Sequence, residues 1–205
     1  MNAPAAFPSV TGIARLRGFV TSFAELLVGA RTQASILQSG AAHLQRLVAS
    51  DDWLPEAFAR PDPERYTQYL LHCDSRERFS VVAFVWGPGQ RTPIHDHRVW
   101  GLVGVLRGAE RVQHFDQRSD GTIVAVGEPA LLQRGEVEAF GPGLGDIHQV
   151  SNGLEDRPSV SIHVYGGNIG AIRRATYDEA GREKPFISGY ANDVLPNFWD
   201  RSEPV

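Results

Sequence analysis

Residues 89–108 read GQRTPIHDHRVWGLVGVLRG, and this stretch contains two histidines, His95 and His97, that one residue separates. In a β-strand the side chains of residues i and i+2 point to the same face, so this spacing places two imidazoles side by side without bending the backbone. Imidazole is a good ligand for first-row metal ions. A third histidine, His148, follows in the segment GDIHQVSN at 145–152, on another predicted strand. We therefore predict a metal site formed by His95, His97 and His148.

The part of the chain before this stretch has the pattern of helices. Apolar residues recur at spacings of three and four over 12–29 and again over 32–49, which predicts two amphipathic helices. We expect a short third helix over Trp53–Phe58 and further helical turns around Glu64–Leu71. Residues 1–75 should then form a mostly helical cover for the rest of the protein.

From Phe79 onward the apolar period changes to two and the segments become short. The predicted strands are 79–86, 93–97, 101–107, 109–117, 122–126, 130–132, 137–140, 147–151 and 158–165, with one more near 171–177. Many short strands separated by Gly, Pro and Asn turns are typical of a β-sandwich or barrel. We predict a mainly β fold with its barrel over 79–177 and a C-terminal tail over 178–205, all in one domain, 1–205.

Composition narrows the classes of function. The chain has 205 residues, 42% hydrophobic and 21% charged, which suits one domain with one buried core. A net charge of −4 without a run of Lys or Arg argues against a nucleic-acid or anionic membrane partner. The single cysteine, Cys73, excludes an intrachain disulfide and a cysteine-based zinc cluster. No membrane span and no secretory signal are evident, so we expect a cytoplasmic monomer or small homo-oligomer that acts on a small molecule.

A second polar group lies on the predicted strand 158–165. Ser161, His163 and Tyr165 alternate with Ile162 and Val164, so the three polar side chains share one face and the two apolar ones share the other. Hydroxyl, imidazole and phenol groups in a row can form a hydrogen-bonded chain that fixes the phenol and moves a proton. We call this predicted chain the Ser161–His163–Tyr165 relay.

The spacing around the histidines resembles the two motifs of the cupins, small jelly-roll β-barrels that hold a metal in the barrel mouth. The first motif is matched by Gly89, His95, His97 and Gly108, and the end of the second by Gly145, His148 and Asn152. Where many cupins have a metal-binding glutamate, this sequence has Gly101. Three neutral histidines would leave a divalent ion its full charge, which favours an anionic group of the substrate such as a thiolate.

Together with the relay, these residues resemble the thiol dioxygenases of the cysteine dioxygenase family. The matching segments are Trp86–Gly89, Ile94–His97, Gly104–Gly108, Asp146–His148 and the three relay residues. The resemblance implies one non-haem Fe(II) per chain, held by His95, His97 and His148, with O₂ as co-substrate. It also implies that both oxygen atoms enter the sulfur of a thiol to give a sulfinic acid. Tyr165 would then hydrogen-bond to the oxygen or the substrate.

Two further positions bear on the choice of thiol. In animal-type cysteine dioxygenases an arginine near the start of the barrel binds the substrate carboxylate, and a cysteine is cross-linked to the active-site tyrosine. The present sequence has Gln68 and Gly101 at those places. In the branch that resembles 3-mercaptopropionate dioxygenase, the carboxylate-binding arginine follows the tyrosine strand, which points to Arg174, with Arg173 as the alternative. We therefore expect 3-mercaptopropionate as substrate, Gln68 as a second polar contact, and no cross-link to Tyr165.

Three other interpretations remain open from the sequence. The same site could oxidise L-cysteine to cysteine sulfinate. A non-catalytic cupin could bind a metal or small ligand as a sensor, but the relay would then have no purpose. A zinc or manganese cupin with isomerase or hydrolase activity is expected to have a carboxylate ligand in place of Gly101. For His43, His72 and His114 we expect roles outside the metal site.

Overall fold

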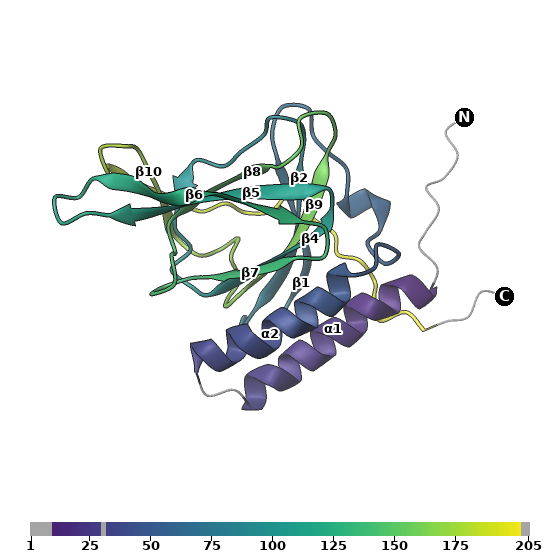
Figure 1. Cartoon of the computed structure of the whole chain (residues 1–205). Helices are drawn as coiled ribbons and strands as arrows, with labels where there is room; N and C mark the ends of the chain where they lie inside the picture. Colours follow the sequence, from purple (N-terminus) through teal and green to yellow (C-terminus); the bar gives the residue numbers. More distant parts are fainter. Residues whose placement is uncertain (1–9, 30–31, 202–205) are drawn as a thin grey trace.

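The computed structural model describes residues 10–29 and 32–201, in which two helices precede a series of strands (Figure 1). The predicted domain also includes 1–9, 30–31 and 202–205, which lie outside the described residues. The helices are α1 (Val10–Gly29), α2 (Gln33–Val48) and the 3₁₀ turn η1 (Glu56–Phe58). The strands are β1 (Thr67–Cys73), β2 (Ser80–Trp86), β3 (Ile94–His95), β4 (Gly101–Arg107), β5 (Ala109–Gln117), β6 (Ile123–Gln133), β7 (Val137–Phe140), β8 (His148–Asn152), β9 (Ser159–Tyr165), β10 (Arg174–Tyr177) and β11 (Glu183–Phe186).

Within the described ranges the strands form two antiparallel sheets that face each other. One sheet has the order β1-β2-β9-β4-β7 and the other the order β11-β10-β3-β8-β5-β6. Neighbours in each order are mostly far apart in sequence, as in a jelly roll. This arrangement confirms the expected mainly β fold with N-terminal helices. No helix of the described residues is long and apolar enough to cross a membrane.

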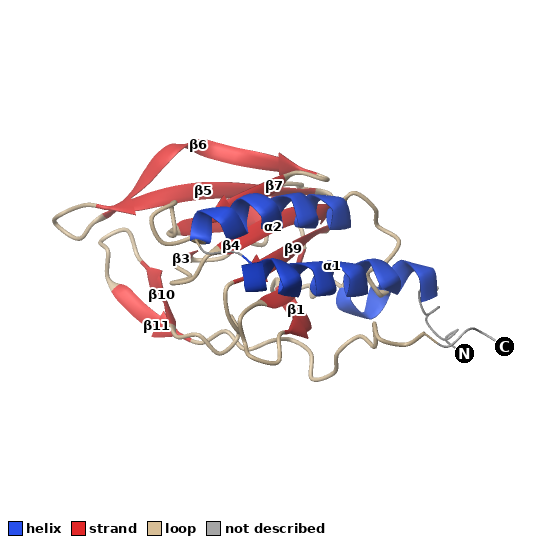
Figure 2. Cartoon of the chain, turned by 90° about the horizontal axis from the view of Figure 1, so that it is seen from below, coloured by secondary structure: helices blue, strands red, loops and turns tan. Residues whose placement is uncertain are grey.

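Both long helices lie on the outer face of the five-stranded sheet (Figure 2). Leu16 and Phe23 of α1 and Leu44 of α2 are fully buried there, together with Leu102 of β4 and Ile162 of β9. Two glycines make the close contact possible. A methyl group added to Gly40 would lie 2.9 Å from the Leu102 side chain, and one added to Gly104 would lie 3.0 Å from Leu44. The two long helices therefore cover the outer face of this sheet.

The second core lies between the two sheets. Its buried members include Val82, Phe84 and Trp86 of β2, Val103 of β4 and Val150 of β8. Strand β9 contributes to both cores, because Ile162 and Val164 face the helices while Tyr165 faces the interior between the sheets. The alternation expected over 161–165 is therefore present, with both faces buried.

Several local predictions are wrong. The segment Glu64–Leu71 is not helical, because β1 begins at Thr67 and pairs with β2 over its whole length. Tertiary pairing outweighs the weak helical preference of this Leu-rich segment. The regions 122–126 and 130–132 belong to one strand, β6, and the tail contains a further strand, β11. Of the predicted helix over 53–58 only the turn Glu56–Phe58 forms.

Candidate metal centre

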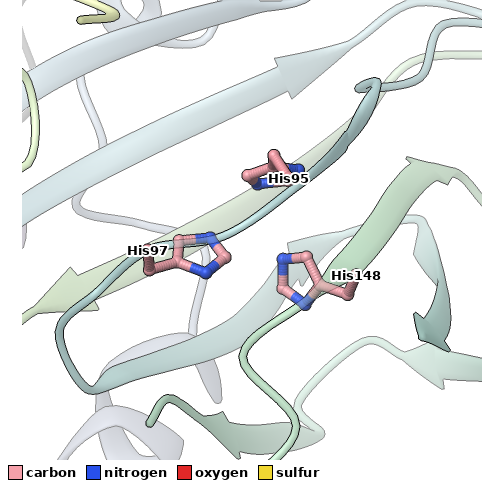
Figure 3. A group of neighbouring side chains, drawn as sticks. All are labelled: His95, His97 and His148. Atoms are coloured by element: carbon pink, nitrogen blue, oxygen red, sulfur yellow. The ribbon is translucent and has the colours of Figure 1, made fainter. Parts of the chain in front are cut away.

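The structure brings the three predicted histidines together around a common space (Figure 3). His95 lies on β3, His97 follows it, and His148 begins β8, where it is the direct backbone partner of His95. The ring centroids lie 4.7 Å apart for His95 and His97, 4.9 Å for His95 and His148, and 4.6 Å for His97 and His148. One ring nitrogen of each lies within 4.8 Å of the others. This spacing is suited to a single metal ion.

Neighbouring oxygens orient two of these rings. Nδ1 of His95 lies 3.0 Å from the carbonyl oxygen of Pro93, and Nδ1 of His97 lies 3.2 Å from Oδ1 of Asp146. A ring whose Nδ1–H is bound in this way presents its Nε2 lone pair to a metal. Asp146 also accepts the backbone N–H groups of His97 and Arg98, and Arg98 has a left-handed φ of 61°. The carboxylate of Asp146 therefore fixes both the turn and the ring of His97.

Burial keeps the three imidazoles neutral. Loss of solvation lowers the pKa of His95 to about 4 and lowers the pKa values of His97 and His148 well below the usual value. A neutral imidazole has the free lone pair that a metal ligand requires. In addition, Nδ1 of His148 is buried and has no hydrogen-bond partner among the described residues. The donor set and this unpaired nitrogen fit a bound divalent metal ion.

The Ser161–His163–Tyr165 relay is formed on β9. Oγ of Ser161 lies 2.9 Å from Nε2 of His163, and Nδ1 of His163 lies 3.0 Å from the hydroxyl of Tyr165. All three side chains are buried. The Tyr165 ring stacks beside His97 at 5.6 Å between centroids, so the relay ends next to the histidine cluster. Burial raises the pKa of Tyr165, which keeps its phenol protonated.

A cavity of about 410 Å³ joins the histidines to the relay and the predicted substrate residues. Its walls include His95, His148, Tyr165, Arg174, Gln68 and Trp86. Lys184 also lines it, whereas none of the described residues around it is Asp or Glu. The cavity is therefore cationic and partly apolar.

Arg174 and Gln68 both face this cavity, and Arg173 does not line it. Arg174 is 4% exposed, donates from Nη2 to Oγ of Ser188 at 2.7 Å, and lies over the ring of Phe186 at 4.7 Å. Its Nε–H is buried without a hydrogen-bond partner among the described residues. Gln68 donates from Nε2 to the carbonyl oxygen of Gly189 at 2.5 Å. Arg173 is exposed on the protein surface.

Position 101 has a structural explanation. Gly101 of β4 is the backbone partner of both Tyr165 on β9 and Phe140 on β7. The Phe140 ring occupies the space where a side chain at 101 would lie, because an added methyl group would be 2.2 Å from it.

Cys73 lies on β1 and is not among the residues that line the cavity.

Sequence reasoning missed two buried carboxylates. Glu110 of β5 is 1% exposed and contacts the hydroxyl of Ser161. Asp96 is 6% exposed and accepts hydrogen bonds from the backbone N–H of Ala175 at 2.7 Å and the hydroxyl of Tyr177 at 3.0 Å. The sequence pattern could have predicted the burial of Glu110, because period-two alternation places it on the same face of β5 as the buried Val112.

The remaining histidines lie outside the cluster. His114 is paired with Glu138 at 2.8 Å, and this hydrogen bond raises the pKa of His114. His43 lies on α2, where its Nδ1 is 2.8 Å from Arg46. His72 packs between the rings of Phe79 and Phe198. These placements agree with roles outside the metal site.

Comparisons with known proteins place the chain in a family. The family model described as cysteine dioxygenase type I matches residues 18–179, which is more than half of the chain. Cysteine dioxygenase type 1 of Danio rerio is 28% identical over 154 residues, which cover 73% of this chain and 70% of that protein. The enzyme of the same name from Homo sapiens is 26% identical over 111 residues, which cover 53% of this chain and about half of that protein, 54%.

Solved structures of low identity are also similar. The protein TT1209 from Thermus thermophilus aligns with a TM-score of 0.43 and 23% identity over 55% of this chain and 92% of that one. A Klebsiella pneumoniae protein with a double-stranded β-helix domain aligns with a TM-score of 0.44 and 19% identity over 55% of this chain and 87% of that one. Because the cysteine dioxygenase type I model matches residues 18–179, this chain belongs to the cysteine dioxygenase type I family.

Proposed function

We propose that this thiol dioxygenase uses Fe(II) and O₂ to oxidise 3-mercaptopropionate to its sulfinic acid, with one iron per chain. The observation that carries the choice of substrate is Arg174, which lines the same cavity as His95 and His148 and has a buried Nε–H without a partner among the described residues. A carboxylate is the group that best satisfies a guanidinium, since two parallel N–H···O bonds can form. A short thiol with a terminal carboxylate would then reach both Arg174 and the histidine cluster.

The ligands of the iron in this proposal are His95, His97 and His148. They are neutral and buried, and the rings of His95 and His97 are held by Pro93 and Asp146. When bound, the iron would supply a redox-active Lewis acid at which thiol and O₂ meet. The three imidazoles add no negative charge, so the site favours an anionic sulfur.

The remaining cavity residues position the substrate and handle its proton. Arg174 would hold the carboxylate, and Gln68, which lines the same cavity, would add an uncharged hydrogen bond. Trp86 and Phe186 provide apolar surface for the two methylene groups and exclude water. Tyr165 is the relay residue next to the histidine cluster, where its hydroxyl can exchange a hydrogen bond with the thiol or the oxygen. The overall reaction, R–SH + O₂ → R–SO₂H, balances without a further reductant.

The charge of the cavity supports 3-mercaptopropionate over L-cysteine. Arg174 and Lys184 line the cavity, and none of its described lining residues is acidic. The ammonium group of L-cysteine would therefore enter a cationic site without a carboxylate partner, which costs free energy. Cysteamine has an ammonium group and no carboxylate, so it should be the poorest substrate of the three. We also propose a cytoplasmic location and a monomer or small homo-oligomer.

An oxygen-electrode assay combined with metal analysis tests this proposal. We expect purified protein with stoichiometric iron to consume one O₂ per 3-mercaptopropionate, with a kcat/KM that falls in the order 3-mercaptopropionate, L-cysteine, cysteamine. A higher kcat/KM for L-cysteine would make the protein a cysteine dioxygenase by activity. Absence of oxygen consumption with all three thiols would support the non-catalytic cupin. Activity with zinc or manganese and none with iron would overturn the choice of metal.

A further inference from the structure

The relay on β9 continues to a carboxylate on the opposite sheet. Glu110 of β5 is 1% exposed, and one of its carboxylate oxygens accepts the hydroxyl proton of Ser161. The same oxygen lies 3.5 Å from Nε2 of His163. We propose that Glu110 is a positioning residue that sets the direction of hydrogen bonds in the relay and balances the charge of His163 during proton transfer. The second half of this inference rests on the proposed function.

The hydrogen bonds of Ser161 fix the direction at the start of the relay. A serine hydroxyl donates one hydrogen bond and accepts two. The indole N–H of Trp86, which can only donate, lies 3.0 Å from Oγ of Ser161. An ionised carboxylate only accepts hydrogen bonds, and an oxygen of Glu110 is the acceptor of the Ser161 hydroxyl. The remaining lone pair of Oγ is therefore available to accept a hydrogen bond from His163, 2.9 Å away.

This assignment determines the tautomer of His163. If the Ser161 oxygen accepts a hydrogen bond from Nε2 of His163, the proton of the neutral imidazole is on Nε2 and the free lone pair is on Nδ1. Nδ1 then accepts the hydroxyl proton of Tyr165, 3.0 Å away. The Phe84 ring packs on His163 with 4.3 Å between centroids, which holds the imidazole in this position. The Tyr165 oxygen consequently presents a lone pair to the cavity instead of its proton.

A phenol oriented in this way can accept the proton of the thiol. As the S–H bond breaks, a new O–H bond forms on Tyr165, and the original hydroxyl proton passes to Nδ1 of His163. The imidazolium produced is balanced by Glu110 at 3.5 Å. Because Nδ1 of His163 lies 3.0 Å from the Tyr165 hydroxyl, the phenol can pass on its own proton while it accepts the proton of the thiol. The proton returns by the same route to the sulfinate product.

The direction of the relay can be measured without catalysis. Ring ¹⁵N NMR of the full-length chain, freed of iron, distinguishes the two neutral tautomers of a histidine, and loss of the signal in His163→Gln assigns it. We expect the Nε2–H tautomer for His163. The Nδ1–H tautomer would overturn the direction of the relay. This result does not depend on which thiol is oxidised, so it stands or fails separately from the proposed function.

The charge-balancing role is tested by Glu110→Gln, which keeps the shape of the side chain and removes its charge. We expect kcat to fall about 100-fold, in the range that general acid–base catalysis contributes, with KM and iron content little changed. The matched control is Glu138→Gln, which makes the same change in the His114–Glu138 pair outside the relay and should leave kcat unchanged. An unchanged kcat in Glu110→Gln would overturn the proposal that Glu110 balances the charge of His163.

A second variant covers the case in which Glu110→Gln does not fold. Ser161→Ala removes the hydroxyl that links Glu110 to His163 and leaves the carboxylate in place. Its kcat should fall to a similar extent. Where Glu110→Gln does fold, its combination with Ser161→Ala should be no slower than either single variant, because both residues act through His163. If the fold-decrease in kcat of the double variant equals the product of the two single decreases, Glu110 acts outside the relay.

Discussion

His95 and His148 are direct backbone partners across β3 and β8, with 4.9 Å between their ring centroids. The register of this strand pair therefore places two of the three proposed metal ligands opposite each other. His97 joins them because it follows His95 by two residues and its ring is held by Asp146. Substitution of one ring should remove metal binding while the sheet remains formed.

We expect His148→Ala to lose iron. Two remaining imidazoles bind a divalent ion much more weakly than three. The matched control is His114→Ala, because His114 is the β5 backbone partner of His148 and its ring centroid lies 6.0 Å away, outside the cluster. Iron content measured by mass spectrometry should be near zero in the first variant and stoichiometric in the second. Equal iron content in both variants would contradict the assignment of His148.

Arg174→Ala should raise the KM for 3-mercaptopropionate while iron is retained. A hydrogen-bonded ion pair contributes about 1.5–3 kcal/mol, which corresponds to an increase in KM of about 10- to 100-fold. Arg173→Ala is the control, because that side chain is exposed and does not line the cavity. Steady-state kinetics of the two variants decide between the adjacent arginines. A KM effect in Arg173→Ala alone would reverse our choice.

Gly101→Ala should destabilise the protein. The added methyl group would meet the Phe140 ring at 2.2 Å, and overpacking of this kind costs about 1–3 kcal/mol. Because a smaller side chain at 140 makes room, Phe140→Leu should recover part of the lost stability when it is combined with Gly101→Ala. Thermal denaturation of the wild type, the two single variants and the double variant measures this coupling. Additive losses in the double variant would show that the two residues do not compete for space.

The strands with clear alternation and a turn at each end could be predicted closely from sequence. The bounds of β4 and β5 match the predicted segments 101–107 and 109–117, because Gly108 between them has a φ of 73° that interrupts the strand. Strands β1 and β11 were missed. Each lies at the edge of its sheet, so it is defined mainly by its pairing with β2 or β10. Sequence alone does not reveal such pairing.

The same limit applies to the candidate site. The relay could be predicted because its residues are two positions apart on one strand, which fixes their common face, and His95 and His97 could be paired by the same spacing although β3 ends at His95. Glu110 could not be joined to Ser161, because the two residues lie on different sheets and meet only when the barrel closes. Arg174 and Arg173 could not be separated until β10 showed which side chain faces inward.

The loop between β1 and β2 gives a prediction for stability against pH. Asp74 is 8% exposed and accepts hydrogen bonds from Nε of Arg78 at 2.9 Å, Nη2 of Arg78 at 2.8 Å and the backbone N–H of Arg76 at 3.0 Å. The hydrogen bonds from Arg78 lower the pKa of Asp74 in the folded protein. The stability that it contributes is therefore present above the unfolded pKa of about 3.9 and is lost as the pH falls below that value.

Asp74→Asn should consequently lower the free energy of unfolding by about 2 kcal/mol at neutral pH. The difference from wild type should shrink below about pH 4, where the wild-type carboxyl group also becomes protonated. Denaturant unfolding at neutral and acidic pH measures both values. A difference that stays constant over the acidic range would show that the effect of the substitution is not electrostatic.

The β10–β11 hairpin has a consequence for how enzymes of this architecture can diverge. Within the described residues, β10 pairs with β11 and with the two-residue strand β3, and it carries Arg174 while β11 carries Lys184 and Phe186. The histidines and the relay lie on other strands. If Arg174 holds the substrate as proposed, most of the charge that selects the substrate lies on this hairpin, apart from the residues that would hold the metal and move the proton. Replacement of this hairpin alone is a direct route to a barrel that oxidises a differently charged thiol.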